Sequence, residues 1–201
     1  MIGIVDYEAG NLRSVETAMK HLGADFFISR NPEELLKADR MIFPGVGEAK
    51  SSMEVLERTG LDKAVREFAD SGKPMLGICL GCQIFFEHSE ERDTECLGII
   101  PGRVKEFSAD MGLKVPHMGW NQVRHEGRHP VFEGIKEESS FYFVHSFYPS
   151  APKEFEIGST EYGIGFTSAA SKDNVVATQF HPEKSGEVGL KLITNFINWK
   201  I

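Results

Sequence analysis

The first half of the chain alternates short apolar runs with segments of helical periodicity. Residues 2–5, 24–29 and 41–43 have the length and composition of buried parallel strands, and a fourth run, residues 74–79, ends at a cysteine. Strands that alternate with helices in this way imply right-handed crossovers and an open parallel sheet. Ligands bind such sheets at the carboxyl ends of the strands. The chemistry of the protein is therefore expected where these runs stop.

Local signals predict where the helices begin and end. Apolar residues recur at helical spacing over residues 12–22, with Asn11 as the N-cap and Gly23 as the stop. The order Asn31-Pro32 is typical of a helix start, because proline is tolerated in the first turn. Further helical segments are predicted at residues 55–56 and 61–68.

The second half of the chain has more glycines, prolines and short β-like runs. These runs lie at residues 103–107, 141–145, 155–159 and 175–180. Lys172-Asp173-Asn174 is typical of a hairpin turn, and residues 189–199 have the pattern of an amphipathic helix. The acidic segment 89–95 is interpreted as a solvated linker. The pattern as a whole predicts a single α/β domain, residues 1–201, with an open, mostly parallel sheet flanked by helices and extra strands in the second half.

Composition narrows the functional class. The chain has 201 residues, 41% of them hydrophobic, which is enough for one sizeable core. Its formal net charge of −8 argues against a surface for nucleic acid or for anionic membranes. Three cysteines do not make a disulfide framework and suit a reducing compartment. We see neither a signal-peptide pattern nor an apolar run of membrane-spanning length, so we expect a cytoplasmic protein.

The run at residues 74–79 carries the first chemical signal. Cys79 is flanked two residues either side by Gly77 and Gly81, and a helical pattern follows, which is the cysteine form of the nucleophile elbow. A sharp strand-to-helix turn exposes the sulfur, and the helix N-terminus favours the thiolate and any oxyanion beside it. Two other interpretations remain open at this point. Cys79 could be an inert core cysteine, or Cys79 and Cys82 could form a redox pair.

A partner residue decides between these interpretations. One imidazole can act as both base and acid for a thiol nucleophile if a third group orients it. His181 follows the β-like run 175–180, and Pro182 fixes a turn that presents Glu183. A Cys79-His181-Glu183 triad is therefore predicted, with a surface His-Pro turn as the alternative. We interpret the remaining histidines as surface residues (His21, His88, His125 and His129) or as structural residues beside apolar segments (His117 and His145).

The two motifs together, residues 77–81 and 179–183, resemble those of the class I (triad) glutamine amidotransferases, in the order and at the separation of that family. The resemblance implies the flavodoxin-like fold of the family and makes a redox pair or a zinc site unnecessary. Further segments resemble the glutaminase subunits of imidazole glycerol phosphate synthase, and they lie at residues 4–12, 44–47, 116–121 and 143–146. The departures are Glu8 for a usual glycine, Cys82 for methionine and Phe147 for tyrosine.

The resemblance also implies roles for other residues. The backbone N–H groups of Leu80 and Val46 would form the oxyanion hole, and the substrate-binding positions would be Gly47, Gln83, Glu91, Ser146 and Phe147. No cofactor or metal is implied. The implied partner is a (β/α)8-barrel cyclase that receives ammonia, in contact with Asn11, Trp120, Tyr142 and Lys184. Alternatives are the glutaminase subunit of another synthase (anthranilate, pyridoxal phosphate or purine) and a catalytically silent scaffold subunit of the same fold.

Overall fold

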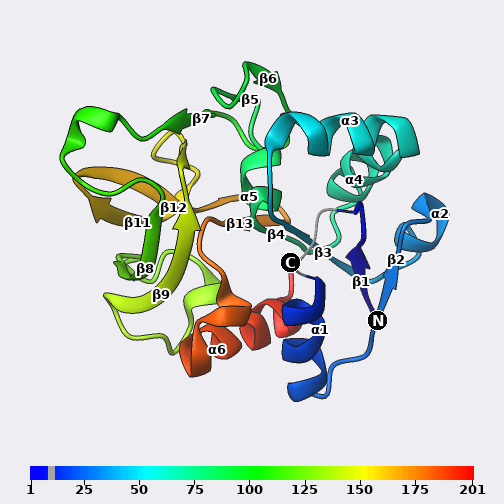
Figure 1. Cartoon of the computed structure of the whole chain (residues 1–201). Helices are drawn as coiled ribbons and strands as arrows, with labels where there is room; N and C mark the ends of the chain where they lie inside the picture. Colours follow the sequence, from blue (N-terminus) through cyan, green and yellow to red (C-terminus); the bar gives the residue numbers. More distant parts are fainter. Residues whose placement is uncertain (9–11) are drawn as a thin grey trace.

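The computed structural model describes residues 1–8 and 12–201. Its central sheet has seven strands in the order β11-β12-β13-β4-β3-β1-β2 (Figure 1). The parallel strands are β1 (Ile2–Val5), β2 (Phe26–Ser29), β3 (Arg40–Gly45), β4 (Met75–Cys79) and β13 (Val175–Thr178). Two antiparallel strands, β12 (Ile164–Lys172) and β11 (Glu156–Tyr162), complete one edge. The predicted mostly parallel α/β sheet is confirmed.

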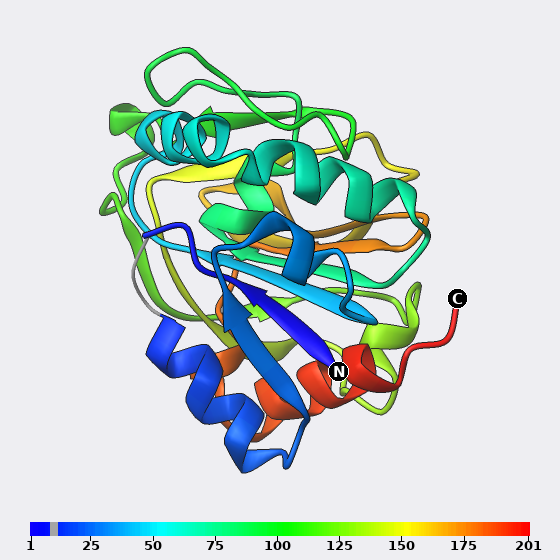
Figure 2. The same cartoon turned by 90° about the vertical axis from the view of Figure 1, so that its right-hand side faces the viewer.

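Helices cover both faces of this sheet. They are α1 (Leu12–His21), α2 (Pro32–Leu35), α3 (Ala49–Thr59), α4 (Leu61–Asp70), α5 (Leu80–Ile84) and α6 (Gly186–Asn198). Helices α1 and α6 lie together on one side, and α3 and α4 lie on the other (Figure 2). Three short 3-10 helices are η1 (Ala109–Met111), η2 (Pro130–Phe132) and η3 (Pro182–Lys184).

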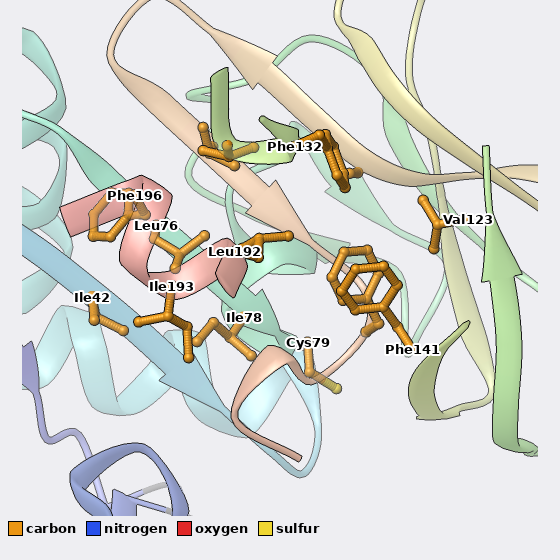
Figure 3. Packing of buried hydrophobic residues seen from close by; sticks show 14 of the residues in the cluster. Ile42, Leu76, Ile78, Cys79, Val123, Phe132, Phe141, Leu192, Ile193 and Phe196 are labelled. Atoms are coloured by element: carbon orange, nitrogen blue, oxygen red, sulfur yellow. The ribbon is translucent and has the colours of Figure 1, made fainter. Parts of the chain in front are cut away.

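The core is divided by the sheet because neighbouring strand residues point to opposite faces. On β4, Met75 packs into the cluster under α3 and α4, whereas Leu76 packs into the cluster under α1 and α6. Leu192 and Phe196 of α6 lie over this second face, close to the strand that ends at Cys79 (Figure 3). A fully buried leucine or phenylalanine contributes roughly 1.5–3 kcal/mol. The strand that ends at Cys79 is thus held by packing on both sides.

Local signals explain the element boundaries. Asn31 caps α2, because its side-chain oxygen accepts from the backbone N–H of Glu33 at 2.9 Å, as its position before Pro32 predicts. Gly60, with a φ of 75°, separates α3 from α4. Among the described residues, no helix is both long and apolar enough to cross a membrane.

Two smaller sheets account for the extra strands. The first has the order β10-β7-β5-β6, with β10 at Phe147–Ser150, β7 at Arg103–Glu106, β5 at His88–Ser89 and β6 at Thr94–Glu95. The second is the antiparallel pair of β8 (His117–Val123) and β9 (Ser139–His145).

The interpretation of residues 89–95 as a solvated linker is wrong. Ser89 and Thr94 are buried, because β5 and β6 pair as a short hairpin against β7. Arg92 also donates to Glu48 at 2.9 Å, which joins this hairpin to the start of α3. The segment is therefore an ordered hairpin of the folded domain, and it holds the side chains between its two strands in fixed positions.

Candidate active site

Cys79 stands at the junction of β4 and α5 with φ 54° and ψ −107°. A non-glycine residue with positive φ is strained, and such strain is common at nucleophile elbows. The flanking glycines are required by close packing: a Cβ at Gly81 would lie 1.9 Å from the carbonyl oxygen of Phe43, and one at Gly77 would lie 2.6 Å from the ring of Phe85. The predicted elbow geometry is confirmed.

His181 reaches the same edge of the sheet from the neighbouring strand. β13 pairs in parallel with β4. His181 lies just after the end of β13, at the same edge of the sheet where β4 ends at Cys79. Its backbone N–H donates to the carbonyl of Tyr142 at 2.9 Å. Its ring nitrogen Nδ1 lies 2.8 Å from Oε1 of Glu183, and both side chains are buried. Since a carboxylate accepts hydrogen bonds, Nδ1 carries the proton and Nε2 is the nitrogen left for the thiol.

Charge couples His181 to Cys79. Burial alone lowers the pKa of His181, but the Cys79 thiolate and the Glu183 carboxylate outweigh burial and raise that pKa to about 10. His181 Nε2 makes no complete hydrogen bond to a described residue, although its interaction with the Cys79 side chain contributes to the raised pKa. Catalytic pairs of this kind commonly tighten when substrate binds. The arrangement is chemically able to supply a nucleophile, a proton carrier and an orienting carboxylate.

The second cysteine of the C-x-x-C pair is unsuited to redox chemistry. Cys82 is buried, and burial together with the nearby Cys79 raises its pKa well above the ordinary value, which suppresses the thiolate. Cys79, Cys82 and Cys96 are all free. Within the described part of the chain, no group of three or more histidine, cysteine or acidic side chains could hold a metal ion.

Cys79 opens into a pocket of about 340 Å³. All seven residues predicted for the oxyanion hole and for substrate binding line it: Val46, Gly47, Leu80, Gln83, Glu91, Ser146 and Phe147. Pro116, Val144 and His145 complete the lining. The pocket therefore gathers residues from the loop after β3, from α5, from the β5–β6 hairpin and from the end of β9 and start of β10 around one sulfur atom.

Two polar side chains in the pocket can bind an ammonium group. Gln83 donates from Nε2 to the carbonyl of Phe147 and to Oε1 of Gln179, both at 2.8 Å, so its amide oxygen is the group that can accept from a ligand. Glu91 accepts from the backbone N–H of Ala49 at 2.7 Å. Partial burial raises the pKa of Glu91, and the bond from Ala49 opposes this rise.

Two residues, His125 and Gln179, were not anticipated correctly from the sequence. His125 is buried and stacks on Phe132 at 4.5 Å, so its interpretation as a surface histidine is wrong. His117 and His145 are buried structural histidines, as predicted, and Nδ1 of His117 lies 2.9 Å from Nε2 of His145. Sequence reasoning missed Gln179 as a polar neighbour of the thiol. The only signal for it was its position two residues before His181.

Three of the predicted partner residues, Trp120, Tyr142 and Lys184, lie within the described residues. Trp120 is 59% exposed on β8, which excludes core packing as the reason for it. It pairs across the ladder with Tyr142, their rings 6.2 Å apart. Lys184 is half-buried in η3, directly after Glu183. Asn11 lies outside the described residues.

Known proteins are similar to this chain in both sequence and fold. The family model "Glutamine amidotransferase class-I" matches residues 3–199. Imidazole glycerol phosphate synthase subunit HisH from Methanosarcina acetivorans is 51% identical over 199 residues, 98% of this chain and 97% of that protein. The subunit of the same name from Dehalococcoides mccartyi is 48% identical, over 98% of this chain and 96% of that protein.

Solved structures support the fold alone, because their identity is low. PurLQS from Thermotoga maritima has a TM-score of 0.77 at 18% identity, covering 98% of this chain and 97% of that chain. A glutamine amidotransferase of solved structure has a TM-score of 0.74 at 20% identity, with the same coverage.

Proposed function

The chain belongs to the class I glutamine amidotransferases, and from that premise we propose that it is the glutaminase subunit of imidazole glycerol phosphate synthase, in histidine biosynthesis. It hydrolyses L-glutamine to L-glutamate and ammonia. One observation carries the proposal: Cys79 ends β4 and His181 follows the paired strand β13, with Glu183 at 2.8 Å from the imidazole, beside a pocket of substrate size.

The reaction begins with attack of the Cys79 sulfur on the side-chain carboxamide carbon of glutamine. His181 accepts the thiol proton through Nε2 and gives it to the departing nitrogen, so that ammonia leaves and a γ-glutamyl thioester remains. Water, deprotonated by His181, then hydrolyses the thioester and restores the thiol. Glu183 holds the imidazole tautomer throughout, and its charge stabilises the imidazolium.

The pocket residues bind and polarise the substrate. The N–H groups of Leu80 and Val46 stabilise the oxyanion, and each such donor lowers the barrier by roughly 3 kcal/mol. Gln83 and Glu91 accept hydrogen bonds from the α-amino group. Gly47, Ser146 and Phe147 bind the substrate through their backbone. The loop of Val46 and Gly47 reorients before its N–H group points toward the oxyanion, and binding of the partner favours this change.

The partner is a (β/α)8-barrel cyclase, which uses the ammonia to make imidazole glycerol phosphate and AICAR. Trp120, Tyr142 and Lys184 contact it, and Asn11 belongs to the same proposed surface. This surface is connected to the proposed triad, because the backbone of Tyr142 is hydrogen-bonded to His181 and to Ser185. The cytoplasm is the proposed location, since free cysteines persist in a reducing compartment.

Glutamate production from glutamine by the purified chain, alone and with a liganded cyclase subunit, tests the proposal. We expect a low basal rate that rises strongly with the cyclase and vanishes in Cys79→Ala. Trp120→Ala should keep the basal rate and the thermal stability but lose the stimulation. A rate unaffected by the cyclase would overturn the pathway assignment. Turnover that survives Cys79→Ala would overturn the triad.

A further inference from the structure

A chain of buried hydrogen bonds connects the substrate pocket to the nucleophile. The carbonyl oxygen of Phe147 accepts from Gln83 Nε2 at 2.8 Å and lies 2.8 Å from Nδ1 of His145. Gln83 Nε2 also donates to Oε1 of Gln179 at 2.8 Å, and Nε2 of Gln179 lies 3.8 Å from Cys79 Sγ. Gln179 is fully buried, so its amide has no water to bind instead.

The direction of these bonds is fixed at one end. An amide side chain can be placed in two orientations, but a backbone carbonyl can only accept. Gln83 must therefore turn its nitrogen toward Phe147. The same nitrogen faces Gln179, so Gln179 must present its oxygen there. The opposite end of Gln179, which faces the sulfur, is then the N–H donor.

From this geometry we infer that Gln179 is a positioning residue that donates a hydrogen bond to the Cys79 thiolate and holds Gln83 in place for the α-amino group. The inference rests on the proposed function, since it assigns a role within the same reaction. A donor beside the sulfur stabilises the thiolate over the thiol. It also fixes the sulfur on the side of the pocket from which it attacks the carboxamide.

The two ends of Gln179 predict separate effects. Gln179→Met removes the donor and the acceptor at similar side-chain length. Gln179→Glu keeps an oxygen toward Gln83 and removes the N–H groups. Loss of a hydrogen bond to an ionised sulfur should shift the pH profile of Cys79 alkylation upward by about one unit in Gln179→Met and lower kcat about tenfold. In Gln179→Glu the shift should be larger, because a carboxylate beside the sulfur also repels the thiolate. KM for glutamine should rise several-fold in Gln179→Met, because only there does Gln83 lose one of its two acceptors and keep the Phe147 carbonyl alone.

The readout is the rate of Cys79 alkylation by iodoacetamide as a function of pH, located by mass spectrometry. Burial raises the pKa of both Cys82 and Cys96, which keeps these two thiols unreactive. Ser168→Ala is the matched control: Ser168 is buried on β12 and its carbonyl accepts the backbone N–H of Gln179, but its hydroxyl has no partner within the described chain. It should leave the thiol pKa and kcat unchanged.

Each outcome decides. Wild-type alkylation profiles in both Gln179 variants would overturn the inference and leave the proposed glutaminase standing. A lower melting temperature with an unchanged thiol pKa would show a merely structural role and would also overturn it. A raised thiol pKa in both variants, with a raised KM only in Gln179→Met, supports both parts of the assignment. Failure of the proposed function shows separately, as glutamine turnover that survives Cys79→Ala.

Discussion

The backbone strain at Cys79 predicts that glycine at this position stabilises the fold more than alanine does. Cys79 has φ 54° and ψ −107°, a conformation that glycine adopts freely and that any residue with a Cβ adopts at a cost. The cost of such a conformation is roughly 1–3 kcal/mol. Glycine gives up about 0.4–1 kcal/mol through the greater entropy of its unfolded chain. Cys79→Gly should therefore be about 1 kcal/mol more stable than Cys79→Ala.

The comparison uses two variants without a sulfur, so charge and thiol packing cancel. Both should lack glutaminase activity. A matched pair at an unstrained position gives the opposite sign: Ala177→Gly on β13, where the side chain is fully buried, should lose about 1–2 kcal/mol relative to the parent.

Guanidinium unfolding and calorimetry give the sign directly. For a domain of this size, 1 kcal/mol corresponds to about 2–4 °C in melting temperature. If Cys79→Gly were less stable than Cys79→Ala by the amount seen at Ala177, the elbow would hold no strain and the reasoning would be wrong. If Cys79→Gly is instead the more stable of the two, opposite to the effect at Ala177, the backbone geometry of Cys79 costs stability that the surrounding sheet supplies.

Two further predictions concern packing and pH. Gly81→Ala should destabilise the fold by roughly 2 kcal/mol or more, because its Cβ would overlap the Phe43 carbonyl. The control is Gly165→Ala, whose Cβ meets only a flexible carboxylate at 3.3 Å. Urea unfolding of the two variants checks this prediction, and equal unfolding midpoints would contradict it. Burial lowers the pKa of His117 to about 4 and that of His145 to about 3. The unfolded chain therefore binds more protons below about pH 6.5, and stability should fall as pH drops from about 6.5 toward about 4. Unfolding curves at about pH 7 and about pH 5 should show the loss, and it should be smaller in His145→Gln; a flat pH dependence of the parent would refute it.

Strongly patterned elements could be predicted from the sequence. The apolar runs of β1, β3, β4 and β13 were found because strands buried on both faces are continuously hydrophobic. The elbow was found because its glycines recur at fixed offsets from Cys79. The substrate-binding positions came from family resemblance, since nothing in the local pattern points to Glu91.

Other elements carry weak or inverted signals. β12 was missed because its buried residues are small or polar, among them Thr167 and Ser168. β8 was missed because its outward-facing positions carry the large apolar side chains of Met118 and Trp120, which inverts the usual pattern of apolar residues inside and polar residues outside. Gln179 was missed because its partners are distant in the chain, and no local pattern predicts a contact across 96 or 100 positions.

The central position of β4 links catalysis to the cooperativity of unfolding. β4 is hydrogen-bonded on one side to β3 and on the other to β13, which leads into His181. Amides at the centre of a sheet exchange with solvent only when the whole domain opens, whereas edges and loops open locally. The spacing between thiol and imidazole is therefore insulated from local fraying, and the active geometry persists until the entire sheet comes apart.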